Sequence, residues 1–453
     1  MRFFNTEGPV RPDKHYCLPP LGRWDLPEVL ELIAREKYFL LHAPRQTGKT
    51  SCLLALMERL NGEGRYRALY VNIEPAQAAR EDVVLGMAAV VQAIANSARW
   101  RLKDAETESL ARHVLREEAG LTALGSFLTR WSEQSPQPLV LLLDEVDALV
   151  GDTLISLLRQ LRAGYPQRPA AFPSTVVLCG VRDLRDYRIH SSAGREVITG
   201  GSAFNIKAAS LRLGDFSTAD VAALLGQHTD ETGQAFTAEA LARVWSLTRG
   251  QPWLVNALAD VACFRLPAGR DRARSIDVNL IDAAKEELIL RRVTHLDQLA
   301  DKLREERVRR IIEPMLAGNA LGVVPEEDRD YLVDLGLLRR TDGGGLVIAN
   351  PIYREVLPRV LASGPQDSLP QISPSWLDAN GDLDSERSAH PRRAGVGKER
   401  LSDRPTPRVP YRAAPAESRR SQSSRSKRIG RRDPTSGPIP STRSTSAGDL
   451  TAG

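Results

Sequence analysis

A phosphate-binding loop is the clearest chemical signal in the sequence. The turn Gly48-Lys49-Thr50 is preceded by an apolar run and followed by a helical pattern. A loop of this kind directs backbone N–H groups at a polyphosphate, whose β and γ phosphates the lysine neutralises. The threonine hydroxyl is a ligand for Mg²⁺, and the N-terminus of the following helix favours an anion. The sequence therefore predicts a site for a nucleoside triphosphate, namely Mg²⁺-bound ATP.

The loop departs from the usual pattern at one position. The pattern G-x-x-x-x-G-K-[ST] begins with glycine, whereas this chain has Ala43 there. The backbone at this position must therefore tolerate a Cβ. The alternative interpretation is a chance Gly-Lys-Thr in an ordinary strand–helix turn. The residues expected to contact the nucleotide are Ala43, Pro44, Arg45, Gln46, Thr47, Gly48, Lys49, Thr50 and Ser51.

Two acidic residues follow a second apolar run. Residues 139–143 are all apolar, and Asp144 and Glu145 come next. In open α/β sheets, ligands bind at this end of a buried strand. We expect Asp144 to hold Mg²⁺ together with Thr50, and Glu145 to polarise the water that attacks the γ phosphate. Taken alone, a solvated acidic turn would be the better interpretation, but the preceding phosphate loop favours the catalytic one.

Arg182 and Pro252 complete the candidate site. Arg182 follows the apolar run 175–180, where its guanidinium is placed to sense the γ phosphate. A solvated loop charge is its alternative. Pro252 opens a predicted helix in Gly250-Gln251-Pro252 and would pack against the base or ribose. The alternative for Pro252 is ordinary helix-start chemistry.

The elements that carry these motifs alternate between strands and helices. This alternation favours an α/β fold with a parallel sheet covered on both faces. The helix after the phosphate loop is expected to end at Asn61-Gly62. Apolar runs predict strands over residues 37–43, 68–73, 138–144 and 175–180, and helical periodicity predicts helices over 49–61, 80–98 and 103–134.

After about residue 210 the pattern becomes helical. A helix over 326–335 is followed by two apolar pieces that flank an Asp-Gly run at 342–345, which predicts a hairpin. A closing helix over 352–361 completes a winged-helix-like unit. The preceding helices are expected over residues 218–225, 237–247, 253–264, 277–304 and 305–316.

The net charge of +5 is concentrated at the C-terminus. Residues 385–453 hold 16 of the 62 Lys and Arg residues and 6 of the 57 Asp and Glu residues, so this tail has a net charge of +10 and the rest has −5. The tail lacks Phe, Trp, Met and Cys, so we expect it to be disordered. Residues 364–384 are interpreted as a linker or the start of a lost segment. The hypothesis is a frameshift near residue 385, and the alternative is a genuine basic arm that binds nucleic acid or acidic partners.

The cysteines and the apolar segments indicate the cellular compartment in which the protein is expected. The four cysteines are far apart and have no metal-like spacing, which fits a reducing compartment. The N-terminus has no apolar signal region, and no apolar run approaches 18 residues. These features predict a soluble cytoplasmic protein that does not span a membrane.

The combination of motifs resembles the bacterial AAA-like ATPases that are related to the archaeal ATPase and STAND groups of the AAA+ superfamily. The stretches 4–10 and 203–207 look like that family too. The resemblance implies a five-stranded ATPase core over 1–210, in which the strand at 175–180 lies between the other two motif-bearing strands. It implies a sensor role near Arg182, a helical lid over 211–300 that Gly250-Gln251-Pro252 brings to the nucleotide, and a winged helix over 301–363.

The leading functional hypothesis is an ATPase whose hydrolysis of Mg²⁺-bound ATP drives or resets a conformational switch. One alternative is a DNA-binding module that ATP regulates. The acidic residues of the helix at 326–335 oppose contact with DNA phosphates. Another alternative is a signalling or defence scaffold that forms a homo-oligomer on binding ATP and has little turnover.

Overall fold

The computed structural model describes residues 1–118, 120–183, 188–190, 197–199, 205–291, 301–319 and 321–366. Residues 1–371 form one compact unit, and the following account concerns this unit. The predicted disordered tail at 385–453, the frameshift hypothesis and most of the linker at 364–384 lie outside the described residues.

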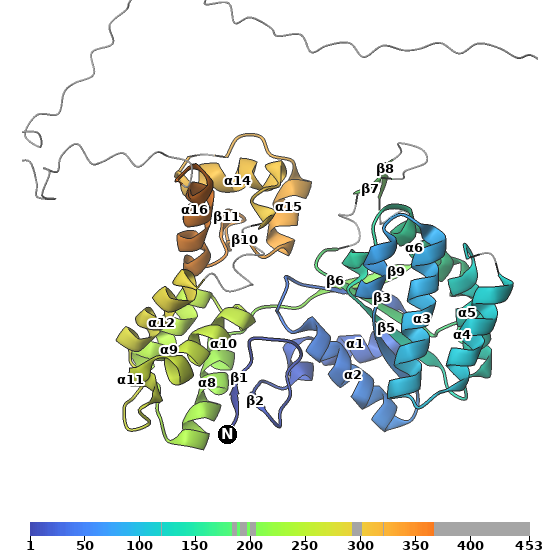
Figure 1. The fold of residues 1–453 in the computed structure, drawn as a ribbon, viewed down its shortest axis with the longest axis horizontal. Helices are drawn as coiled ribbons and strands as arrows, with labels where there is room; N and C mark the ends of the chain where they lie inside the picture. The colour runs from blue at the N-terminus through green and yellow to red at the C-terminus, as the bar shows by residue number, and fades with distance from the viewer. Residues whose placement is uncertain are drawn as a thin grey trace, which may run out of the picture. The chain divides into compact units, whose positions relative to one another are not determined.

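A five-stranded sheet forms the centre of the N-terminal part (Figure 1). All its pairings are parallel. The spatial order is β4-β5-β6-β3-β9, so β6 lies between the other two motif-bearing strands, β3 and β5, which confirms the expected topology. The strands are β3 (Tyr38–His42), β4 (Arg67–Asn72), β5 (Leu139–Asp144), β6 (Thr175–Gly180) and β9 (Lys207–Arg212).

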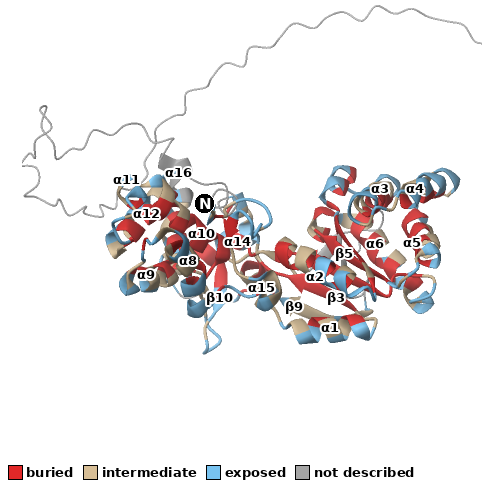
Figure 2. Ribbon diagram, turned by 90° about the horizontal axis from the view of Figure 1, so that it is seen from below, coloured by how far each residue is buried: buried red, intermediate tan, exposed pale blue. Residues whose placement is uncertain are grey.

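Helices cover both faces of this sheet. Along β5, Leu141 and Leu143 pack with the cluster that includes α3 to α6, whereas Val140 and Leu142 pack with α1 and α2. Successive side chains of a strand point to opposite faces, so a strand that is apolar throughout requires this double cover. Figure 2 shows the buried strands between the helical layers. The helices are α1 (Leu26–Ala34), α2 (Lys49–Glu63), α3 (Val83–Arg101), α4 (Glu106–Glu117), α5 (Ala123–Gln134) and α6 (Gly151–Gly164).

Some predicted helix boundaries differ from the structure. The region predicted to be helical over about 103–134 contains two helices, α4 and α5, and the helix predicted over 218–225 extends to Thr232. The helix after the phosphate loop extends to Glu63 and ends at Gly64, which has φ 71°. Asn61 does not terminate that helix, because its side-chain amide is bonded to the backbone of Ala68 at 2.8 and 2.9 Å and thereby ties α2 to β4.

Helix α3 is long and apolar enough to cross a membrane, by length and composition alone. Its apolar side chains, however, lie in the cluster beneath the sheet, where Met87, Val90, Val91 and Ile94 are fully buried. The core helix of a soluble protein passes the same test of length and composition, so this one helix is weak evidence for a membrane span.

The N-terminal segment packs with the helices that follow the sheet. Phe4 in β1 (Phe3–Phe4) and Tyr16 in β2 (His15–Tyr16) are buried in the apolar cluster of those helices, and both rings contact that of His228 in α8. Arg2 forms an ion pair of 2.9 Å with Glu231 of the same helix. The helices are α8 (Thr218–Thr232), α9 (Ala238–Thr248), α10 (Pro252–Asp260), α11 (Pro267–Arg270) and α12 (Val278–Leu290).

The last described part contains two helices, a hairpin and a closing helix, in the predicted order. Strands β10 and β11 pair antiparallel, as the Asp-Gly run indicated. Beyond this order, the winged-helix interpretation stays a prediction. The elements are α14 (Glu306–Leu316), α15 (Glu326–Asp334), β10 (Leu338–Arg340), β11 (Leu346–Ile348) and α16 (Pro351–Gln366). Another antiparallel pair, β7 (Arg188–His190) with β8 (Val197–Thr199), precedes β9.

The packing of the N-terminal segment predicts different effects for two adjacent phenylalanines. Phe4 is 1% exposed and Phe3 is 43% exposed. We expect Phe4→Ala to destabilise the helices that Phe4 contacts by about 3–5 kcal/mol, because the change leaves a cavity in their core. The control, Phe3→Ala, should cost less than about 1 kcal/mol. Thermal unfolding followed by circular dichroism measures both, and equal shifts for the two variants would contradict this packing.

Candidate functional site

The predicted phosphate loop connects β3 to α2 in the expected strand–loop–helix arrangement. Gly48 has φ 96°, and a Cβ at this position would lie 2.9 Å from Nη1 of Arg23. The positive φ therefore favours glycine, and a larger residue would also require the end of the Arg23 side chain to shift. Ala43 is not among the described residues with positive φ, so its Cβ strains no backbone. This explains how the loop tolerates its departure from the usual pattern.

The side chain of Lys49 lies within the loop itself. Its ammonium donates to the carbonyl oxygens of Ala43 at 2.8 Å and Pro44 at 3.0 Å. The residue is 6% exposed. Among the described contacts no carboxylate neutralises this ammonium, so its charge is available to an anion that enters the loop.

The two predicted metal ligands lie side by side. The Thr50 hydroxyl donates to Oδ2 of Asp144 at 2.7 Å, and the Tyr70 hydroxyl donates to the same oxygen at 3.0 Å. Hard oxygen donors of this kind suit Mg²⁺, which needs few protein ligands when phosphates and waters complete its coordination. The described residues contain no cluster of three or more His, Cys, Asp or Glu suited to a metal ion.

Glu145 follows Asp144 in a left-handed backbone conformation, with φ 61°. Its backbone N–H donates to Oδ1 of Asp144 at 3.0 Å. Burial raises the pKa of the Glu145 carboxyl, and the Asp144 carboxylate raises it further, while Lys49 opposes the shift. Because a general base works best with a pKa near the working pH, this direction suits a proton acceptor.

Two adjoining pockets meet at the loop. The first is lined by Lys49, Thr50, Glu145 and Glu74, among others, and is suited to phosphates and a cation. The second lies between the loop and the helices after the sheet, and apolar side chains such as Leu18 and Phe216 contribute to it. Gly8, Gln46, Gly48 and Ser51 line both pockets, so the two form one continuous site.

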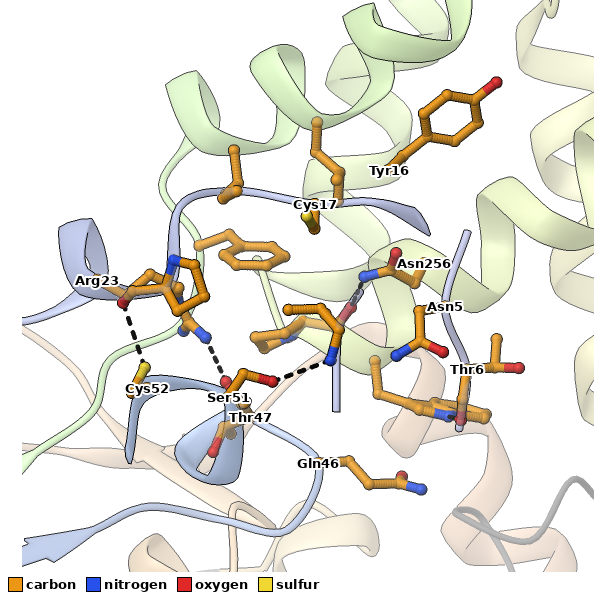
Figure 3. Close-up of a pocket in the computed structure, with 18 of the residues that line it drawn as sticks. Asn5, Thr6, Tyr16, Cys17, Arg23, Gln46, Thr47, Ser51, Cys52 and Asn256 are labelled. Carbon is orange, nitrogen blue, oxygen red and sulfur yellow. Dashed lines mark hydrogen bonds between the residues drawn. The ribbon is translucent and has the colours of Figure 1, made fainter. Parts of the chain in front are cut away.

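The second pocket brings Pro252 and the N-terminal segment together at the loop (Figure 3). The Val10 N–H donates to Oγ of Ser51 at 3.1 Å, and Nε1 of Trp253 donates to the carbonyl oxygen of Thr6 at 2.9 Å. The N-terminal segment is thus bonded to the loop helix and to α10. The resemblance had singled out residues 4–10 but had given them no role.

Arg23 contributes to the site in a way that no sequence pattern indicated. Its guanidinium donates to the carbonyl oxygens of Thr47 and Gly214, and it lies 4.6 Å from the ring centre of Phe216. Burial lowers the pKa of this guanidinium. Arg23 therefore ties the phosphate loop to the segment that joins β9 to α8, and Figure 3 shows its bond to Thr47.

Arg182 is not among the residues that line either pocket. Its guanidinium lies 5.2 Å from the ring centre of Tyr331 in α15, and its charge tends to lower the pKa of Asp147. Burial is the larger influence on Asp147 and raises its pKa. The Asp147 carboxylate accepts a hydrogen bond from the Val181 N–H, which joins the ends of β5 and β6. We had not predicted Asp147.

A protein-family model described as an AAA domain matches residues 33–187. The matched residues include β3, the phosphate loop, and the acids that follow β5. The chain contains an AAA P-loop ATPase domain. No match was found among curated proteins.

Comparison with solved structures found several matches, of which one has a TM-score above 0.5. A Walker-type ATPase of Pyrococcus abyssi is 16% identical, with a TM-score of 0.53, over 78% of this chain and 99% of that one. The Holliday junction branch migration motor RuvB of Thermotoga maritima is 14% identical, with a TM-score of 0.37, over 74% and 95%. Cdc6p of Pyrobaculum aerophilum is 15% identical, with a TM-score of 0.37, over 74% and 88%. The first likeness shows a shared fold.

From the hydrogen bond between Tyr70 and Asp144 we predict an effect on the Mg²⁺ concentration that ATP turnover requires. Tyr70→Phe removes the hydrogen bond that orients the Asp144 carboxylate, and such outer contacts are worth about 10–100-fold in metal affinity or activity. We therefore expect the variant to require about tenfold more Mg²⁺ for half-maximal ATP turnover. Tyr66→Phe is the control, because Tyr66 is similarly buried and no hydrogen bond of its hydroxyl is found among the described contacts. An unchanged Mg²⁺ requirement in Tyr70→Phe would contradict the role.

Proposed function

We propose that this chain binds Mg²⁺-bound ATP in its two adjoining pockets, hydrolyses it, and uses the cycle to change the contact between the phosphate loop and helix α15. The observation that carries the switch is that Asp334, the last residue of α15, lies 3.5 Å from His42 at the end of β3, and that a Cβ added at the following Gly336 would lie 2.9 Å from Pro44 of the loop. The family match supports an ATPase domain, and the geometry of Lys49, Thr50, Asp144 and Glu145 supports hydrolysis.

The phosphates are proposed to lie along residues 43–51. Gly48 and its neighbours would offer backbone N–H groups, and Lys49 would move from the carbonyls of Ala43 and Pro44 to the β and γ phosphates. Thr50 and Asp144 would hold Mg²⁺, which supplies charge neutralisation on the phosphate oxygens when it is bound.

Glu145 is the proposed general base. It lines the phosphate pocket together with Lys49 and Thr50, and burial beside Asp144 raises its pKa. A carboxylate in this position would accept a proton from the water that attacks the γ phosphate. The base and ribose would occupy the second pocket, where Pro252 and Phe216 provide apolar surface.

The contact between α15 and the loop involves several groups at the ends of the strands. Oδ1 of Asp334 lies 3.5 Å from Nδ1 of His42, the last residue of β3, and Oδ2 of Asp334 accepts from the Asp183 N–H at 3.2 Å. Gly336 has φ 77°, and a Cβ there would come within 2.9 Å of Pro44. Both Asp334 and His42 are buried.

This contact supports a direct mechanical link from the nucleotide to α15. The carbonyls that hold Lys49 belong to Ala43 and Pro44, and Pro44 lies so near Gly336 that a Cβ added there would come within 2.9 Å of it. If a triphosphate draws Lys49 away from these carbonyls, the start of the loop is freed to shift against Gly336. In addition, the phosphates of ATP bound in the loop would bring negative charge close to the buried Asp334 carboxylate. ATP binding would therefore weaken the docking of α15.

Nucleic acid is not the partner that this geometry favours for α15. The first turn of α15 contains Glu326, Glu327 and Asp328. Carboxylates at the leading end of a helix repel the phosphates of a groove. The regulated-DNA-binding hypothesis therefore stays secondary to the switch.

Two substitutions separate binding from hydrolysis. Lys49→Ala should abolish ATP binding in calorimetry, because it removes the ammonium that neutralises the phosphates. Glu145→Gln should keep the affinity within about threefold but lower turnover by about 100-fold or more, since the amide cannot accept the proton. Equal ATP affinity in the wild type and Lys49→Ala would refute the proposed site.

From the contact between α15 and the end of β3 we predict that the negative charge of Asp334 weakens ATP binding. Asp334→Asn keeps an acceptor for the Asp183 N–H but removes the negative charge beside the loop. We expect it to tighten ATP binding by about three- to tenfold, which corresponds to about 1 kcal/mol. The control is Asp330→Asn on the same helix, whose carboxylate pairs with Arg340 instead. If calorimetry finds that Asp334→Asn binds ATP with unchanged or lower affinity, the Asp334 charge does not weaken ATP binding and the prediction is contradicted.

A further inference from the structure

A third pocket, separate from the two described above, borders the start of the phosphate loop, and several parts of the fold form its walls. Pro44 and Arg45 come from the loop, Arg212 from the end of β9, Gln251 from the turn before α10, and Arg339 from β10. Its volume is about 630 Å³, which is room for a ligand of nucleotide size rather than a single ion. It shares only Arg45 with the phosphate pocket.

Cationic side chains outnumber acidic ones around this cavity. Its lining includes Asp215, Asp301 and Asp334 as acids, and Arg45, Arg212, Arg249, Lys302, Arg339 and Arg340 as cations. Several of these charges have partners: Arg340 pairs with Asp330, Lys302 pairs with Glu305, and Arg212 donates to the carbonyl oxygen of Val333.

Three of the guanidiniums are not neutralised by a carboxylate. Among the described contacts, Arg45, Arg249 and Arg339 have no ion pair, and Arg249 is engaged only by the ring of Trp245, 5.0 Å from its guanidinium carbon. They are exposed residues from three separate segments of the chain, and all three line this cavity. Guanidinium groups bind phosphate oxygens in a bidentate manner, so three of them around a recess suit a ligand with several phosphate oxygens.

Gln251 supplies an independent sign of a missing partner. It is 7% exposed and lines the cavity, yet its Nε2 has no acceptor in the described structure. Its Oε1 accepts from the Leu254 N–H at 2.6 Å, so the amide cannot turn over without breaking the cap of α10. A buried donor left without an acceptor is unfavourable, and Gln251 lies in the wall of this cavity.

We propose that this cavity is a second anion site, distinct from the ATP site, which takes a small molecule that carries two or more phosphate groups. Arg249 and Arg339 bind its phosphates, and Nε2 of Gln251 donates to one of their oxygens. A recess with these walls fits a small ligand, whereas a nucleic-acid backbone would need an open charged face.

Calorimetric titration of the full chain with inorganic pyrophosphate tests the proposal. The titration uses the Lys49→Ala background, so that binding at the ATP loop does not contribute. We expect saturable binding, and we expect the additional pair Arg249→Gln and Arg339→Gln to weaken it by about tenfold or more. The control pair is Arg265→Gln and Arg309→Gln, which removes the same charge outside the cavity and should change the affinity by less than about twofold.

A further variant tests the buried donor. Gln251→Glu keeps an acceptor for the Leu254 N–H but places a carboxylate where the amide donor was, so pyrophosphate binding should fall by about tenfold or more. Circular dichroism confirms that each variant is folded. The proposal is overturned if pyrophosphate does not bind in the Lys49→Ala background, if the control pair weakens binding as much as the cavity pair, or if succinate or a single-stranded oligonucleotide binds as tightly as pyrophosphate.

Discussion

The parallel pairing of β3, β6 and β5 is the constraint on which the candidate ATP site depends. Thr50 and Asp144 are 94 residues apart in the chain, yet their side chains meet at 2.7 Å. They meet because the carboxyl ends of the paired strands lie at one edge of the sheet, where β3 leads into the phosphate loop and β5 ends in the acids. The apolar residues that fill both faces of β5 maintain this pairing, since each face is buried by its own layer of helices.

The phosphate loop is bonded to, or lies beside, several other parts of the molecule. Lys49 is bonded to the carbonyls of Ala43 and Pro44, and Pro44 in turn contacts Gly336. On the opposite side, Arg23 bonds the loop to the segment before α8. In the proposed switch, a loop that is bonded on both sides would transmit a shift of its backbone to α15 and to α8, because packed interfaces adopt discrete arrangements rather than deforming continuously.

The site residues that form a local motif could be predicted from the sequence, and those that act across the fold could not. The loop at 43–51 and the acids Asp144 and Glu145 follow apolar runs that mark their strands. Tyr70 and Arg23, in contrast, act through a hydroxyl on a neighbouring strand and a guanidinium that crosses to the loop, and neither belongs to a local pattern. Strand β9 was implied only by the resemblance, because Lys207, Ser210 and Arg212 interrupt its apolar run.

The coupling of ATP to α15 is tested most directly by hydrogen–deuterium exchange at the Asp183 amide, whose N–H is bonded to Asp334. The full chain is compared with and without Mg²⁺ and a saturating non-hydrolysable ATP analogue. If ATP weakens the docking of α15, exchange at Asp183 and in residues 332–336 accelerates when the analogue binds. Unchanged or slower exchange at these positions, with the analogue bound, would contradict the account.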